Sequence, residues 1–154
     1  MKFYGLIFVL CFATFSTCSP VGKTNKAIEV KVFGSASEFF KKYPNAQPIE
    51  ATHNDDGKAV FEYGARVNHD KLMASASDVY TAPSRQDAAI DFNYPGEAPY
   101  SITYAKFTVQ QDSGVGKVYI VSGGEGQTSL NWAIVSEGIK EAQYTYDIYS
   151  IVYV

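Results

Sequence analysis

Two glycine-rich segments contain the residue types that most readily suggest chemistry. They read Asp-Ser-Gly-Val-Gly-Lys over residues 112–117 and Ser-Gly-Gly-Glu-Gly over residues 122–126. Glycine loops can bind phosphate through backbone N–H groups, but such a loop requires Ser or Thr after Gly-Lys and then a helix. Here the strand-like residues 118–121 follow Lys117 instead. The pattern therefore predicts structural turns, whose glycines are Gly114, Gly116, Gly123, Gly124 and Gly126.

Catalytic and metal-binding residues do not form a complete set in this sequence. Ser122 precedes a glycine, but a nucleophile elbow needs Gly-x-Ser-x-Gly, and Ile120 occupies the place of the first glycine. The two histidines, His53 and His69, are not accompanied by other residues at the spacing of metal ligands. The oxygen-rich turn at residues 53–57 lacks the twelve-residue calcium loop with its closing Glu. We therefore expect a non-enzymatic protein with no catalytic residue, cofactor or metal.

Aromatic residues are concentrated near the C-terminus, where Trp132 is followed by Tyr144, Tyr146 and Tyr149. Tyrosine combines apolar area with a hydrogen-bonding tip, so an exposed strip of such residues would suit recognition of a partner. Aromatic residues also favour strands because they pack well on a sheet. The sequence leaves both interpretations open, a possible partner surface and ordinary sheet packing.

The N-terminus resembles a secretory signal peptide. Lys2 precedes an apolar run over residues 3–13, and small polar residues follow. A buried strand or membrane anchor is the alternative, but the run is shorter than the roughly 20 residues that span a bilayer. We expect cleavage after Cys18 or Ser19. Since Cys11 is the only other cysteine, the mature chain would contain no disulfide.

Length and composition favour one globular domain over residues 19–154. The 154 residues are 46% hydrophobic, which is enough to form a core. The formal net charge is −3, and it becomes −4 when removal of residues 1–18 takes away Lys2 and no acid. We therefore expect an unknown protein partner, no direct nucleic-acid contact and no membrane contact in the mature form.

Alternation of apolar and polar residues predicts strands through most of the mature chain. The predicted strands are 27–33, 49–52, 59–67, 88–94, 100–109, 117–121, 129–135 and 143–154. A capping box at residues 35–38 predicts a short helix that Pro44 ends. Residues 68–86 show only a possible short strand near Val79 and Tyr80. We predict an all-β fold, a single antiparallel β-sandwich or barrel of about eight strands with one short helix.

The C-terminal third resembles the insect multiprotein bridging factor two family of transcription activators, which includes lepidopteran response-to-pathogen proteins. The resemblance covers residues 100–149, and its most specific part is Gly-x-Gly followed, after a short strand, by Ser-Gly-Gly-x-Gly. The chain departs from the family pattern at residues 137–140, where a second Gly-x-Gly and a basic residue are expected. The resemblance implies no catalytic residues.

Three functions are compatible with these observations. The leading expectation is a secreted insect protein that acts by protein–protein interaction, in defence or in gut, saliva or venom secretion. The second is an intracellular coactivator, nuclear or cytoplasmic, that bridges a regulator to the general transcription machinery, as the resemblance implies. The third is a small-ligand carrier, which rests on the aromatic content.

Overall fold

The structure is a computed structural model that describes residues 28–55 and 57–152, so the predicted signal peptide and both cysteines lie outside the described residues. One helix and eight strands are described: β1 Glu29–Phe33, α1 Ala36–Lys42, β2 Gln47–Ile49, β3 Ala51–Asp55, β4 Lys58–Gly64, β5 Lys71–Tyr94, β6 Ser101–Gln111, β7 Lys117–Gly123 and β8 Leu130–Ile151. All strand pairs are antiparallel and belong to one sheet that does not close. The predicted all-β antiparallel fold with one short helix is confirmed.

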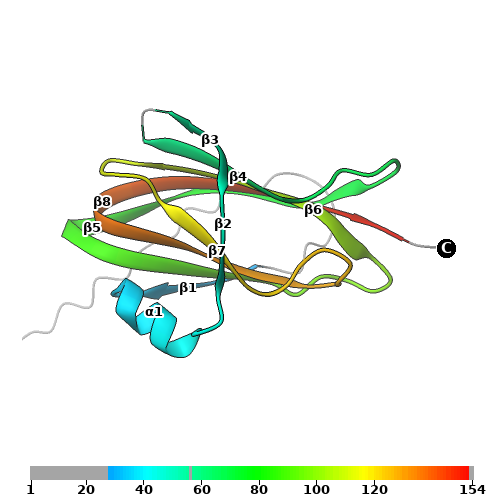
Figure 1. The fold of residues 1–154 in the computed structure, drawn as a ribbon, viewed down its shortest axis with the longest axis horizontal. Helices are drawn as coiled ribbons and strands as arrows, with labels where there is room; N and C mark the ends of the chain where they lie inside the picture. The colour runs from blue at the N-terminus through cyan, green and yellow to red at the C-terminus, as the bar shows by residue number, and fades with distance from the viewer. Residues whose placement is uncertain (1–27, 56, 153–154) are drawn as a thin grey trace, which may run out of the picture.

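Two very long strands, β5 and β8, determine the architecture. They pair with each other from one end to the other, and the opposite side of β8 pairs first with β7 and then with β6. Trp132 and Tyr146 lie fourteen positions apart in β8, a span of about 46 Å in a straight strand. Their ring centroids are nevertheless 5.2 Å apart. Both long strands therefore double over, as Figure 1 shows at its left end, and the sheet becomes a sandwich.

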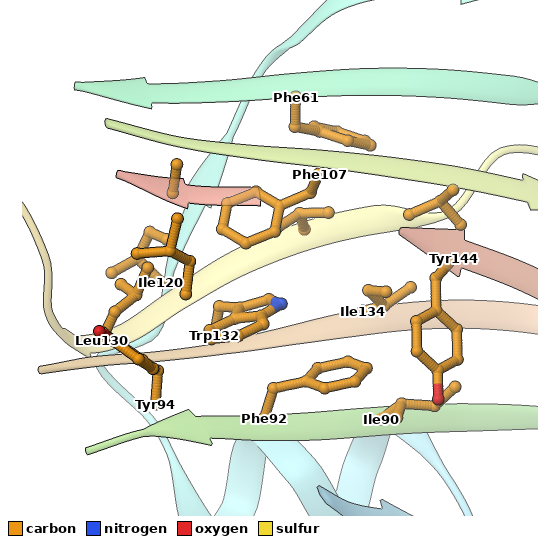
Figure 2. Close-up of a cluster of buried hydrophobic side chains, with 14 of the residues drawn as sticks. Phe61, Ile90, Phe92, Tyr94, Phe107, Ile120, Leu130, Trp132, Ile134 and Tyr144 are labelled. Atoms are coloured by element: carbon orange, nitrogen blue, oxygen red, sulfur yellow. The ribbon is translucent and has the colours of Figure 1, made fainter. Parts of the chain in front are cut away.

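The doubled sheet has two layers, named here from Figure 1. The upper layer contains the first half of β5, the second half of β8, β6, β4 and β3. The lower layer contains β1, the second half of β5, the first half of β8, β7 and β2. The space between them holds the main apolar core, shown in Figure 2, where Phe107 from β6 packs against Trp132 from β8 and Trp132 stacks on Phe92 from β5.

Helix α1 covers the outer face of the lower layer. Ser35 caps the helix by accepting a hydrogen bond from the backbone N–H of Glu38 at 3.2 Å, as the capping box predicts. Phe39 is fully buried among apolar residues of that face, including Phe33 and Ala89. Residues 88–92 of β5 are therefore buried on both faces, because the core lies on one side and α1 on the other.

Two long strands of the structure each contain more than one predicted segment. The predicted strands 129–135 and 143–154 are both parts of β8, and the predicted strand 88–94 is the second half of β5. The stretch 68–86, where only a short strand was expected, forms most of the first half of β5 from Lys71 onward. Its small Ala and Ser side chains hide the alternation because they sit at the margin of the sheet, where little apolar area is buried.

The predicted strands 49–52 and 59–67 are right in kind and wrong at their ends. They correspond to β3 and β4, which pair with each other, but β4 ends at Gly64 instead of continuing to Val67. Gly64 has a φ of 75°, and an added Cβ would lie 2.2 Å from the carbonyl oxygen of Thr103. Glycine adopts this conformation readily and has no Cβ to meet that oxygen, so the strand ends and the chain turns away at Gly64. The short strand β2, which contains Pro48, was not predicted.

Candidate protein-binding site

The structure separates the four aromatic residues that could have formed a partner surface. Trp132 is fully buried and Tyr144 is 6% exposed, so both belong to the core and neither can contact a partner. Tyr146 is partly buried and packs against the same core. Burial raises the pKa of the Tyr144 and Tyr146 hydroxyls above the ordinary value, and the Asp78 carboxylate adds to this. Of the four, Tyr149 alone lies on the outer face of the upper layer.

Tyr149 is the centre of an apolar row that crosses three strands of the upper layer. It is directly opposite Tyr104 on β6 and opposite Leu72 on β5. The two tyrosine rings lie 5.8 Å apart, and Leu72 is 51% exposed. Among the described residues, helix α1 packs on the lower layer, so no helix covers this row. The two partly buried tyrosine rings and the exposed Leu72 beside them form an apolar patch.

Arg66 extends across this row from the loop after β4. Its guanidinium carbon lies 3.6 Å from the centroid of the Tyr149 ring and 6.0 Å from that of Tyr104. A cation over an aromatic face is attracted by the ring quadrupole, and the planar guanidinium can also stack on it. The Arg66 side chain remains 51% exposed. Its outer face is therefore open to a partner while its inner face is held by the tyrosines.

Asp70 fixes the orientation of Arg66. It accepts hydrogen bonds from Arg66 Nε at 2.8 and 3.0 Å and from a terminal guanidinium nitrogen at 2.6 Å. The backbone N–H of Val67 and the Thr103 hydroxyl also donate to it, each at 3.1 Å. The Asp70 side chain is 1% exposed. The Arg66 guanidinium, together with the Val67 and Thr103 donors, lowers the pKa of Asp70 to about 2.

Glu62 and Tyr104 add a second polar pair. The Tyr104 hydroxyl donates a hydrogen bond to the Glu62 carboxylate, which lowers the pKa of Glu62. Burial, followed by this bond, raises the pKa of Tyr104 to about 12. We call the whole group the Arg66 patch, and its members are Glu62, Arg66, Asp70, Leu72, Tyr104 and Tyr149. Tyrosine and arginine are the residue types most enriched among the residues that dominate protein interfaces.

Only Tyr149 of this patch was identified from the sequence. A signal for two more was present, because Arg66 and Asp70 are oppositely charged and four positions apart on either side of a polar segment. At that spacing the guanidinium of Arg66 can bind the carboxylate of Asp70 through two hydrogen bonds and hold the intervening loop closed. Tyr104 and Leu72 carried no such signal, since only strand pairing brings them beside Tyr149.

The five predicted turn glycines are explained by their backbone conformation, by close packing or by both. Gly114, Gly123, Gly124 and Gly126 have φ angles of 61°, 74°, 115° and 77°, a region that favours glycine. At Gly123 an added Cβ would lie 2.1 Å from the carbonyl oxygen of Ser129. Gly116 lacks a positive φ, but a Cβ there would lie 2.8 Å from a methyl carbon of Val109. These glycines are accounted for by backbone geometry and close packing.

Other kinds of site receive no support from the described residues. Within residues 28–55 and 57–152, no group of three or more His, Cys, Asp or Glu side chains could hold a metal ion. No helix in the same ranges is long and apolar enough to cross a membrane. Aromatic rings fill the space between the layers, where Phe92 stacks on Trp132 at 5.1 Å, with the rings 8° from parallel.

Comparison with known proteins identifies one family. The model of the family described as transcription activator MBF2 matches residues 63–150, which extends the resemblance upstream of residue 100. The matched segment begins near the end of β4 and contains nearly all of β5, β6, β7 and β8, including the whole Arg66 patch except Glu62. No curated protein and no solved structure matches the chain.

Proposed function

The chain belongs to the transcription activator MBF2 family, and we propose that it is a non-enzymatic module that binds another protein through the Arg66 patch. The observation that carries the proposal is the position of Arg66, held by Asp70 and by two tyrosine rings while half of its side chain stays exposed. A cation held in one rotamer loses little entropy on binding, so it can add to affinity. An acidic or carbonyl-rich surface would complement it.

A capture experiment tests this proposal. The immobilised protein is incubated with native extract, and retained proteins are compared for wild type, Arg66→Ala and Lys58→Ala. Lys58 is an exposed cation at the far end of β4 and serves as the matched control. We expect at least one partner that wild type and Lys58→Ala retain and Arg66→Ala loses. Identical partner sets for wild type and Arg66→Ala would rule out the patch.

The place of action has two candidates, each supported by its own observation. Residues 1–18 have the three regions of a signal peptide, which supports secretion and a role in defence or in gut, saliva or venom secretion. The family description supports a coactivator that bridges a regulator to the general transcription machinery inside the cell. Both roles use protein binding, so the Arg66 patch would serve either.

Mass spectrometry of the N-terminus of native protein separates the two candidates. A chain that begins at Ser19 or Pro20 and is recovered outside the cell supports secretion. A chain that retains residues 1–18 and is recovered with nuclear proteins supports the coactivator role. Either result leaves the Arg66 test unchanged, because residues 1–18 are remote in sequence from the patch.

A further inference from the structure

On one side of the sandwich, the described residues form one strand fewer in the upper layer than in the lower layer. In the lower layer, β1 pairs with residues 89–93 of β5 and forms the margin. In the upper layer, residues 71–81 of β5 pair with β8 on one side only, and no other described strand pairs with them. The lower layer therefore extends one strand further than the upper layer on this side.

The exposed valines of β1 lie beneath this missing position. Val30 is opposite Phe92 and Val32 is opposite Ile90, so both valines point toward the inner face of the sandwich. They are nevertheless 52% and 48% exposed. Inner-face valines remain exposed because no described strand of the upper layer lies over them. An added strand beside β5 would cover both.

The free edge of β5 is suited to pairing. It is eleven residues long, contains no proline, and has the small side chains of Ala74, Ser75, Ala76 and Ser77 in its middle. The backbone N–H of Val79 bonds to the side chain of Asp78 rather than to β8. In an antiparallel ladder alternate residues face the same neighbour, so Ser75 and Ser77 also direct their N–H and C=O groups to the open edge. Long unprotected edges of this kind accept strands.

We propose that β1 of a second copy of this chain occupies the vacant strand position, so that two chains form a symmetric dimer. The two-fold axis of this dimer runs parallel to the strands, midway between the two layers. It brings the lower layer of the second copy to the level of the first copy's upper layer. The protruding β1 of each chain then lies beside the recessed β5 edge of the other. Val30 and Val32 of one copy pack on the same valines of its partner, because the inner faces of the two β1 strands meet.

The chain's own strand fits the position better than the segment that precedes it. β1 alternates apolar residues toward the inner face with Glu29 and Lys31 toward the outer face, as a marginal strand requires. Residues 19–27 read Ser-Pro-Val-Gly-Lys-Thr-Asn-Lys-Ala, and their only bulky apolar side chain outside proline is one valine. Within one chain, β1 is antiparallel to residues 89–93 of β5. Residues 71–81 run the opposite way because β5 reverses at its bend, so β1 of the second copy pairs with them in parallel.

Sedimentation velocity tests the dimer, and it uses the protein purified in the form that the producing cells yield. Because the interface is small, we expect a monomer–dimer equilibrium with a dissociation constant between about 1 and about 100 µM. Val32→Lys places a charge on an already exposed side chain, and we expect it to weaken the dimer at least about tenfold. The matched control is Val115→Lys, which alters a valine that is 41% exposed in the β6–β7 loop. It should leave the equilibrium unchanged.

A second variant addresses the β5 edge without relying on the valines. Ser77→Pro removes an N–H that faces the open edge, a place where a marginal strand tolerates proline. We expect it to abolish dimer formation while the emission of the single tryptophan, Trp132, remains that of folded protein. Wild-type protein that stays monomeric over the whole range overturns the proposal, as does a dimer that Val32→Lys leaves intact. Arg66→Ala should not alter the dimer, so this test and the capture test fail independently.

Discussion

The indole ring of Trp132 and the phenol ring of Tyr146 meet edge to face at 5.2 Å, although one continuous strand contains both. This contact exists because β8 doubles over and its two halves face each other across the core. Phe92 of β5 joins the same cluster, since its ring lies 5.1 Å from Trp132 and 5.0 Å from Tyr144. The folded-over β5–β8 pair is thus held closed by its own aromatic side chains.

Truncation of Trp132 should therefore destabilise the whole domain. Trp132→Ala removes a fully buried ring from the junction of the two layers, and we expect a loss of about 3–5 kcal/mol in the free energy of unfolding. Trp132→Phe, which keeps an aromatic ring, should lose clearly less. Urea denaturation followed by far-ultraviolet circular dichroism measures both. Equal losses for the two variants would contradict the role assigned to the ring.

Two glycines with similar φ angles should respond differently to alanine. Gly123→Ala must strain the backbone and also move the Ser129 carbonyl, whereas Gly126→Ala meets nothing within 4 Å. We expect Gly126→Ala to cost about 1 kcal/mol from the φ angle alone and Gly123→Ala to cost more than about 2 kcal/mol. Thermal denaturation of the pair gives the comparison. A larger effect at Gly126 would contradict the geometry.

The Asp70 carboxylate should make stability depend on pH in the acid range. Its pKa is lowered from 3.8 in the unfolded chain to about 2 in the folded protein. The contribution is therefore complete above about pH 4 and is lost as the pH falls toward 2. Because Arg66 is half exposed, solvent screens its pairing with Asp70, and the contribution of this pairing to the free energy of unfolding is about 1 kcal/mol. Asp70→Asn should flatten this part of the stability profile, and an unchanged profile would exclude Asp70 as its source.

One partly buried polar pair adds to the apolar contact between the α1 region and the sheet. The Tyr43 hydroxyl donates to Asp91 Oδ2 at 2.8 Å, while Oδ1 of the same carboxylate has no partner among the described atoms. Tyr43→Phe removes the donor to Oδ2, so that neither carboxylate oxygen has a hydrogen-bond partner among the described atoms. We expect a loss of about 1–3 kcal/mol in the free energy of unfolding. The double variant Tyr43→Phe with Asp91→Ala should recover part of it. Denaturant titration of the four proteins completes the cycle, and strict additivity would contradict the coupling.

The local sequence was sufficient to predict the class of the fold. Alternation in residues 100–109 reports burial of one face of β6, and this alternation is a local property of the chain. The capping box at Ser35 is local as well, which is why α1 appears where it was predicted. The Gly-x-Gly and Ser-Gly-Gly-x-Gly turns likewise carried the family resemblance, and the family match over residues 63–150 confirms it.

The tertiary structure alone decided which aromatic side chains are accessible. Trp132, Tyr144 and Tyr149 have the same type of signal in the sequence, but folding over of β8 encloses the first two and leaves the third outside. The Arg66 patch and the missing strand position beside β5 arise in the same way, from pairing between residues far apart in the chain. Composition and alternation describe what each strand can bury. The partner that buries it is set by long-range contacts, and no local pattern encodes them.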